Sequence, residues 1–297
     1  MADKFSLKER IQTFHSIDSL TYSMQIVSII KLKKILNLIT SNRPLSYSVE
    51  QIMKMVICNK LKQGEDTTKE KKHLVITILS NRGFCGDFNG EIRKILAKNF
   101  HKKSENHTYF FIGKKGKEVF KPNLYNDSHY FSLFSDSSDP KDAGEAAGEI
   151  SLKKLNLLVQ EIIQLVKENK VTSISLAYNA FESILRQKAT LKNLFPLQPG
   201  KEDYELAEKF IFEPQINEDI FINYLSDYLT TVLYLHILES EAGEMGARFI
   251  MMKNATDSCK KSITELTLEL NKIRQAGITK DLSEIVSGFK VLRKERG

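Results

Sequence analysis

The last third of the chain contains a long stretch without proline that carries the apolar spacing of an α-helix. Pro214 is the final proline of the 297 residues, and a helical pattern runs with few breaks from about Asp219 to Leu292. As one continuous helix this stretch reaches ~110 Å at about 1.5 Å per residue, far more than the diameter of a domain of this size. It cannot bury its apolar stripe on a small domain alone, so we expect it to pair with a second helix.

The beginning of the chain supplies a candidate for that second helix. Its apolar residues recur every three or four positions, which indicates one helical face: Leu7, Ile11, Phe14, Ile17, Leu20, Met24 and Val27. Between residues 26 and 39 apolar residues cover more than one face, so we expect protein on several sides there. Pro44 is expected to kink the helix or mark its boundary, and helical spacing resumes from Val49 to Leu61.

The middle of the chain changes period and predicts an α/β domain. Strands are expected at Leu74–Leu79, Tyr109–Ile112 and Val171–Ala177, and helices at Phe88–Phe100 and Ala143–Lys170, with an exposed loop at residues 63–72. Strands that alternate with helices at such spacings indicate a sheet with crossover helices. The expected fold class is therefore α/β plus a long α-helical coiled coil. Residues 1–62 and 210–297 form the antiparallel two-helix coil, and the α/β domain at 73–200 is inserted between them.

Composition and charge exclude several classes of protein. Hydrophobic residues make up 41% and charged residues 27%, which excludes a disordered chain, and the charged first thirty residues exclude a signal peptide or a spanning helix. The net charge is +6 over residues 1–72, +5 over 73–200 and −4 over 201–297. Opposite charges on the two ends favour docking between them over binding of nucleic acid. Three distant cysteines, Cys58, Cys85 and Cys259, are interpreted as free thiols.

No catalytic or metal-binding constellation is found. The segment Asn81 to Asn89 (NRGFCGDFN) lies where a phosphate loop would lie, but it lacks the glycine order of one, and a structural strand-to-helix turn is the better interpretation. A helix N-terminus could lower the pKa of Cys85, although no histidine is near in sequence to make it a nucleophile. The six histidines show no ligand spacing. Glu239, Glu241 and Glu244 are interpreted as a solvated helical face.

The apolar seam of the last helix changes phase near its end. Ile263, Leu266, Leu270 and Ile273 keep coiled-coil spacing, as do Ile278, Leu282, Ile285, Phe289 and Leu292, but Ile273 and Ile278 are five residues apart. We hypothesise that this slip lifts the side chains around Arg274 out of the seam. A buried Arg274 would refute the hypothesis.

Three segments resemble a known family. Thr21-Tyr22-Ser23-Met24 with Lys31-Leu32-Lys33-Lys34 and Ser41-Asn42-Arg43-Pro44 form the first, and Ser80-Asn81-Arg82-Gly83-Phe84-Cys85-Gly86-Asp87-Phe88-Asn89 form the second. The third comprises Glu239-Ser240, Glu244, Ala247-Arg248, Met252 to Asp257, and Asn271 to Gly288. Together they are similar to the gamma subunit of the rotary F-type ATP synthase, its central shaft.

The resemblance implies a fold and a set of partners. It implies an antiparallel coil of the terminal helices with a Rossmann-like domain between them, set inside a hexamer of three alpha and three beta subunits. It also implies contact with an epsilon subunit and a membrane c-ring on the cytoplasmic side of a bacterial cell membrane. No cofactor is expected on the chain itself, because the resemblance assigns ATP, ADP and Mg to the alpha and beta subunits. No membrane insertion is expected.

The resemblance also implies roles for individual residues. Met24, Arg274, Gln275, Thr279 and Glu284 are expected to contact the hexamer, and Lys31, Lys33, Lys34, Phe210, Phe212 and Glu213 to contact epsilon or the c-ring. None of these residues is expected to be catalytic. Gly243 replaces the serine usual in the family, and Phe210 and Phe212 replace two tyrosines.

Two alternatives to the rotary ATP synthase stay open at this point. The altered residues 210–214 leave room for the shaft of a specialised F-type-like ATPase, attached to an assembly that replaces the c-ring and does not transport protons. A non-rotary coiled-coil scaffold would show the same helices. An α/β-domain enzyme would need the catalytic residues that the sequence lacks.

Overall fold

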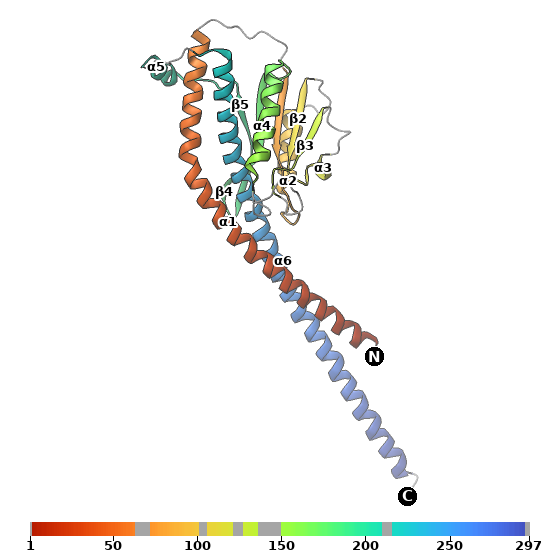
Figure 1. The fold of residues 1–297 in the computed structure, drawn as a ribbon. Coiled ribbons are helices and arrows are strands. Elements are labelled where there is room, and N and C mark those ends of the chain that lie inside the picture. Colours follow the sequence, from red (N-terminus) through yellow and green to blue (C-terminus); the bar gives the residue numbers. More distant parts are fainter. Residues whose placement is uncertain are drawn as a thin grey trace. The chain divides into compact units, whose positions relative to one another are not determined.

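The computed structural model describes residues 2–62, 72–100, 106–120, 127–135, 150–209 and 216–294 (Figure 1). The elements in chain order are α1 (Ala2–Lys62), β1 (His73–Ile78), α2 (Phe88–Asn99), β2 (His107–Ile112), α3 (Gly116–Val119), β3 (Ser128–Phe131), α4 (Leu152–Lys167), β4 (Ser173–Ser183), β5 (Arg186–Phe195), α5 (Lys201–Lys209) and α6 (Glu218–Lys294). They form two compact units. We call residues 1–28 with 249–297 the two-helix unit, and residues 29–248 the α/β unit.

The α/β unit is built on a five-stranded sheet. Its strand order is β3-β2-β1-β4-β5, with the first four strands parallel and β5 antiparallel to β4. The chain moves outward from β1 to β3 and then returns to β4 on the other side of β1. The parallel strands and crossover helices confirm the fold class predicted from the alternating periods.

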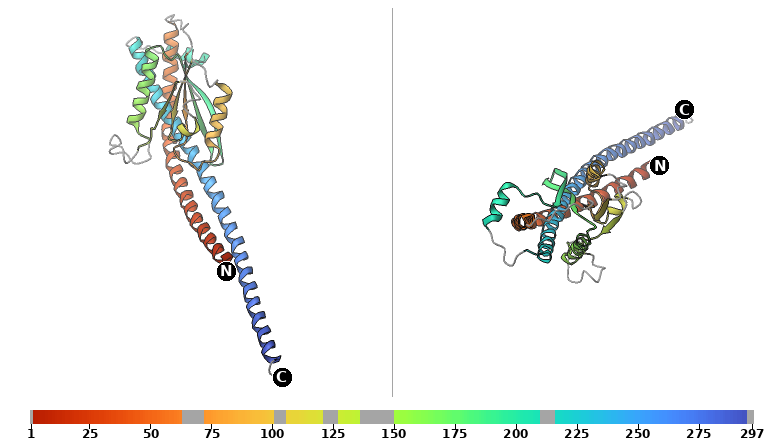
Figure 2. Two further views of the ribbon diagram at one scale, coloured as in Figure 1. Left: turned by 90° about the vertical axis from the view of Figure 1, so that its right-hand side faces the viewer. Right: turned by 90° about the horizontal axis from the view of Figure 1, so that it is seen from above.

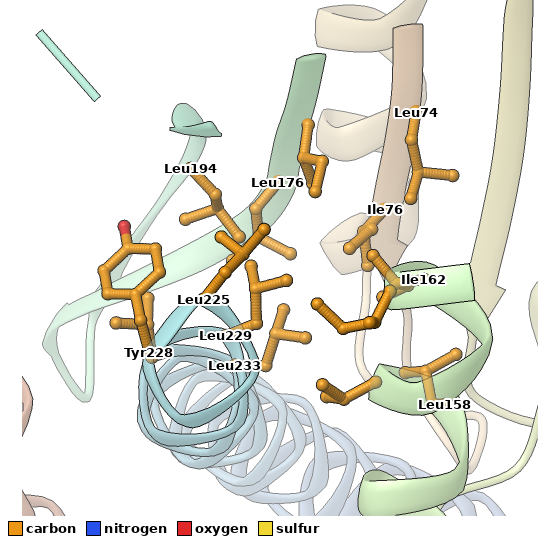
Figure 3. Packing of buried hydrophobic residues seen from close by; sticks show 14 of the residues in the cluster. Leu74, Ile76, Leu158, Ile162, Leu176, Leu194, Leu225, Tyr228, Leu229 and Leu233 are labelled. Atoms are coloured by element: carbon orange, nitrogen blue, oxygen red, sulfur yellow. The ribbon is translucent and has the colours of Figure 1, made fainter. Parts of the chain in front are cut away.

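Helices cover both faces of this sheet. On one face, Ile92 and Leu96 of α2 pack against side chains of β1 and β2 in a compact apolar cluster. On the other face, α4 and the first part of α6 share one core with the sheet (Figure 3). Members of that core with under 2% exposure include Ile76, Leu158, Ile162, Leu176, Leu194, Leu225, Leu229 and Leu233. The long helix is therefore part of the domain core and not an appendage to it.

The buried positions of α1 follow a heptad. The buried members are Leu7, Thr21, Ser28, Leu32, Ile35, Ile39, Ser46, Met53 and Val56, and the half-buried members between them are Ile11, Phe14, Asp18, Gln25, Asn42 and Val49. Alternating steps of four and three are the spacing of a coiled-coil seam. The predicted apolar stripe is wrong at Ile17, Leu20 and Val27, which are 40%, 57% and 52% exposed. At those levels the seam is formed by the polar residues Asp18, Thr21 and Ser28. The prediction failed because apolar spacing alone does not fix which face of the helix is buried.

In the two-helix unit, α1 and α6 run antiparallel, and a threonine hydroxyl of one helix contacts a threonine hydroxyl of the other. The Oγ1 atoms of Thr21 and Thr256 are 2.8 Å apart. Met252, Thr256, Cys259 and Leu266 are the buried side chains of α6 here, and the predicted seam residues Ile263, Leu270 and Ile273 are half-buried. Within this unit α6 continues past the N-terminal end of α1 (Figure 2).

Two further expectations about α1 are corrected. Of the two alternatives given for Pro44, a helix boundary is wrong, because Pro44 lies inside α1 on an exposed position. Water can satisfy the backbone carbonyl that loses its partner there. Protein does not surround residues 26–39, because Ile30 is 64% exposed and Leu38 is 37% exposed, and of the apolar residues there only Leu32, Ile35 and Ile39 are buried. Apolar composition on several faces therefore does not establish burial on several faces.

The remaining differences concern the α/β unit. The strand predicted at Val171–Ala177 extends as β4 to Ser183 and turns back into β5, which the sequence analysis missed, together with β3, α3 and α5. The predicted helix at Ala143–Lys170 is described from Leu152 to Lys167, and residues 63–71 of the predicted loop lie outside the described residues. No helix within the described ranges is both long and apolar enough to cross a membrane.

Candidate functional site

The loop between β1 and α2 is held by side chains on both of its sides. Asn89, at the start of α2, reaches back to Ser80: its Oδ1 accepts from the Ser80 backbone N–H at 3.0 Å and its Nδ2 donates to the Ser80 hydroxyl at 2.7 Å. Gly86 adopts a φ of 61°, in the left-handed region that favours glycine. The structural turn predicted for this segment is what the chain forms.

Helix α6 contributes a carboxylate to this loop. Glu244 accepts hydrogen bonds from the backbone N–H groups of Asn81 at 3.0 Å and of Arg82 at 3.3 Å. Glu244 is only 3% exposed. The interpretation of Glu244 as part of a solvated helical face is therefore wrong, because the tertiary fold places backbone donors opposite it.

Arg248, one helical turn further along α6, completes the contact. Its guanidinium binds the Glu244 carboxylate and donates to the backbone carbonyls of Arg82 and Gly83, each at 3.2 Å. Arg248 is 7% exposed, so nearly all of its charge is satisfied by protein atoms. We call Glu244, Arg248 and residues 80–83 the joint.

Two glycines let α6 approach the sheet closely at the joint. A Cβ atom on Gly243 would lie 3.2 Å from the Phe88 ring and 3.3 Å from the Gln187 side chain. A Cβ on Gly246 would lie 3.3 Å from the backbone oxygen of Ile184. A side chain at 243 would therefore press on α2 and on the β4–β5 hairpin, and the Phe88 and Gln187 side chains would have to shift slightly to admit it.

The joint occupies the place where doubly wound sheets bind ligands. In such folds the crevice lies at the carboxyl ends of the strands, where successive strands leave in opposite directions. Here that point is between β1 and β4, and the loop that follows β1 holds the Glu244 carboxylate. A charged side chain of the chain itself therefore stands at the position where such folds bind an anionic ligand.

A second polar cluster ties α1, α6 and β5 together in the α/β unit. Arg43 donates to Glu239 at 3.1 Å, His236 Nδ1 lies 3.1 Å from the same carboxylate, and Lys192 bonds Glu50 at 3.1 Å. Burial alone would raise the pKa of Glu239, but the bonds from His236 and Arg43 outweigh it and lower that pKa. The cluster fixes the pairing of two of the resembling segments, since Arg43 comes from the first and Glu239 from the third.

Cys85 lies in the joint loop but is not an activated thiol. It is 5% exposed, and burial raises the pKa of its thiol above the ordinary value. The lowered pKa considered from its place before a helix is therefore wrong, because desolvation penalises the thiolate. Within the described ranges, His, Cys, Asp and Glu side chains form no group of three suited to a metal ion.

The residues expected to contact a hexamer are brought together only in part. Arg274, Gln275, Thr279 and Glu284 are all exposed on α6, with Lys280 Nζ 3.8 Å from the Glu284 carboxylate. Met24 is half-buried on α1 in the same two-helix unit. Arg274 is exposed and not buried in the seam, so the observation that would refute the phase-slip hypothesis is not made. Because α1 ends at about this level of α6, the exposure of Arg274 does not by itself require a slip.

The residues expected to contact epsilon or the c-ring are on α1 or outside the description. Lys33 and Lys34 are exposed and Lys31 is half-buried. Phe210, Phe212 and Glu213 lie outside the described residues. The joint was missed as a site in the sequence, although its two halves were visible as separate resembling segments, because no one-dimensional pattern shows that they touch.

The fold and the joint define a class of protein: an open α/β sheet fastened to a pair of long terminal helices. A family model described as ATP synthase matches residues 5–292. The ATP synthase gamma chain of Fusobacterium nucleatum is 31% identical over 96% of this chain and 98% of its own length. That of Bdellovibrio bacteriovorus is 31% identical over 99% of this chain and 100% of its own.

Solved structures agree with the fold. The chain resembles a chain of the Euglena gracilis mitochondrial ATP synthase, OSCP/F1/c-ring, with a TM-score of 0.65 and 14% identity. The match covers 100% of this chain and 96% of the Euglena chain. A chain from the Tetrahymena thermophila mitochondrial ATP synthase central stalk and c-ring gives a TM-score of 0.57 at 19% identity, over 80% and 99%. This chain belongs to the ATP synthase gamma-chain family, and its function is that of a rotary shaft.

Proposed function

We propose that the chain is the central rotating shaft of a bacterial rotary ATP synthase. It turns inside a hexamer of three alpha and three beta subunits and meets an epsilon subunit and a membrane c-ring at its other end. It lies on the cytoplasmic side of the membrane as a peripheral subunit. The bacterial gamma chains of similar length and the central-stalk structures support this assignment.

One observation carries the proposal. Residues 274–288 of α6 are exposed throughout, including four large apolar side chains between 53% and 57% exposed: Ile278, Leu282, Ile285 and Val286. Since Thr21 lies opposite Thr256 and the helices run antiparallel, α1 ends at the level of about residue 275 of α6. A single helix with an uncovered apolar stripe is stabilised by a surrounding partner. We call residues 277–288 the tip.

The polar residues beside the tip suit a contact that forms and breaks as the shaft turns. A guanidinium offers several donors to carbonyl or carboxylate groups, and a partly hydrated ion pair contributes only about 1 kcal/mol. Arg274 and Gln275 therefore hold a subunit of the hexamer without locking to it. Rotation drives catalysis because each angle of the asymmetric shaft stabilises a different conformation in each surrounding subunit.

A second group of residues is assigned to epsilon and the c-ring. Lys31, Lys33 and Lys34 lie on α1 in the α/β unit, and Lys33 and Lys34 are exposed. Residues 210–213 complete this contact in the proposal. The alternative is that another assembly replaces the c-ring. Imaging of the native complex distinguishes the two, because it shows whether a c-ring or another assembly is attached at these residues.

The chain has no catalytic site of its own in this proposal. ATP, ADP and Mg are bound by the alpha and beta subunits, and the chain transmits only mechanical work. The purified chain is therefore expected to show no ATP turnover.

Copurification tests the proposal. The tagged chain, expressed with its neighbouring genes, is expected to isolate one copy with three copies each of two larger nucleotide-binding subunits. A chain lacking residues 277–297 is expected to give a less stable complex in the same preparation. Isolation of the intact chain as a homodimer, without those subunits, would support a scaffold instead.

A further inference from the structure

The joint contains the donors that bind an oxyanion. Two backbone N–H groups, of Asn81 and Arg82, and the guanidinium of Arg248 converge on the Glu244 carboxylate. Successive backbone N–H groups with an arginine are the same donors that hold phosphate groups in proteins. In this chain they hold a carboxylate supplied by α6.

The joint is closed to solvent. Glu244 is 3% exposed and Arg248 is 7% exposed, and Gly243 and Gly246 allow α6 to lie close to α2 and to the β4–β5 hairpin. The carboxylate also lies at the point between β1 and β4 where folds of this kind admit phosphate. Residues 81–89 thus occupy the place of a phosphate loop without its glycine order, and the donors at that place already hold a carboxylate.

We propose that residues 80–83 with Arg248 form an oxyanion site whose resident anion is Glu244. The native chain is therefore closed to the phosphate of a nucleotide at this point, and removal of the carboxylate leaves a site for a free oxyanion. This inference does not rest on the shaft function, since it concerns only contacts within the α/β unit.

The test uses the full-length chain with Glu244→Ala. Its melting temperature is measured against increasing inorganic phosphate, formate or acetate, with chloride keeping the ionic strength constant. We expect a saturable rise of about 3 °C with at least one of these anions. The wild-type chain is expected to show no saturable response, and neither is Glu269→Ala, which removes an exposed carboxylate from the same helix.

The three anions distinguish the size of the site. Formate or acetate replaces the lost carboxylate alone, whereas phosphate also needs room for a tetrahedral group. General salting effects of phosphate raise the stability of any folded protein, but they act equally on the wild type and do not saturate. The difference between variant and wild type is therefore the quantity that decides.

Glu244→Gln is the second variant. Its amide fills the same space without the charge, so we expect it to fold and to show no saturable anion response. If Glu244→Ala fails to fold when chloride is the only anion present, we expect added formate, acetate or phosphate to restore its folding. The proposal is overturned if no anion stabilises or restores Glu244→Ala, or if the wild type or Glu244→Gln responds to the same degree.

Discussion

Arg248 stands between a carboxylate and two backbone carbonyls, almost completely removed from water. The net contribution of such a buried ion pair is small, because desolvation opposes the attraction between the charges. Loss of one partner is much more costly, since the other charge and its neighbours then stay buried without partners. The joint is therefore sensitive to single substitutions on either side.

Arg248→Ala is expected to lower the free energy of unfolding by about 3–5 kcal/mol, because it leaves Glu244 and the carbonyls of Arg82 and Gly83 without the guanidinium. Arg248→Lys keeps the charge but not the fork of donors, and we expect about half of that loss. Urea denaturation followed by circular dichroism measures both. Arg93→Ala, at an exposed position of α2, is the control and is expected to change stability by less than about 0.5 kcal/mol. Equal effects of Arg248→Ala and Arg93→Ala would contradict the role of the joint.

His73 gives the stability of the fold a pH dependence. Burial, and then the neighbouring His107, lower the pKa of His73 below its ordinary value. The unfolded chain therefore binds a proton at His73 at a higher pH than the folded chain does. The neutral His73 side chain therefore contributes its full share of the free energy of unfolding above pH ~6.5. Below that pH this contribution falls by at most about 1.4 kcal/mol per pH unit.

His73→Asn is expected to flatten this loss between pH 7 and pH 5 in urea denaturation. The amide of asparagine can still bond the Ser173 hydroxyl, which His73 Nδ1 contacts in β4. His15→Asn, at an exposed position of α1, is the matched control and should leave the pH dependence as in the wild type. A slope that is identical in His73→Asn and the wild type would show that His73 does not contribute.

At the scale of the helices, the seam of the two-helix unit is polar where coiled coils are usually apolar. Asp18, Thr21, Gln25 and Ser28 occupy successive seam positions of α1, and Thr21 meets Thr256 across the seam. The Thr21 hydroxyl also lies 3.0 Å from the Ile17 carbonyl. Thr21 can therefore donate a hydrogen bond to this carbonyl while it accepts one from Thr256. A buried polar pair in a seam favours one register of the helices over its neighbours.

Thr21→Val and Thr256→Val test this pair in a double-mutant cycle. Each single change leaves a buried hydroxyl without its partner and is expected to cost about 1 kcal/mol of unfolding free energy, and the double variant less than the sum. Urea denaturation of the full chain gives the four values. Thr264→Val, on an exposed position of α6, is the control. Additivity of the two single changes would mean that the hydroxyls do not interact.

At the scale of the whole molecule, the chain separates residues that stabilise it from residues that it leaves for a partner. The joint and the sheet core are buried, whereas Arg274, Gln275 and the tip are exposed. Changes at the two kinds of position should therefore affect different measurements.

The double variant Arg274→Ala with Gln275→Ala is expected to leave the unfolding free energy of the isolated chain unchanged, because both side chains are exposed. In the reconstituted complex we expect the ATP hydrolysis rate to fall about tenfold, the effect of losing about 1.4 kcal/mol of polar contact during turnover. Arg93→Ala in the same complex is the control. An unchanged rate in the double variant would remove these two residues from the proposed contact with the hexamer.

Periodicity was sufficient for the elements whose environment is uniform along their length. The strand at residues 74–79, the helix at 88–100 and the proline-free helix of the last third were all predicted near their observed bounds. Edge strands were missed, because β5 is only partly buried and its polar and apolar residues mix. The seam of α1 was predicted in the wrong phase beyond Phe14, because the helix turns Asp18 and Thr21 inward and leaves Ile17 and Leu20 outside.

Two long helices and an α/β module could be predicted from the sequence, because hydrophobic period and proline placement act locally along the chain. The resembling segments also identified the family. The role of Glu244 could not be predicted in this way, because a carboxylate on a helix is solvated or buried according to what lies opposite it in the folded chain. The partners of Glu244 are backbone N–H groups more than 160 residues away in the chain, and no local pattern encodes their approach.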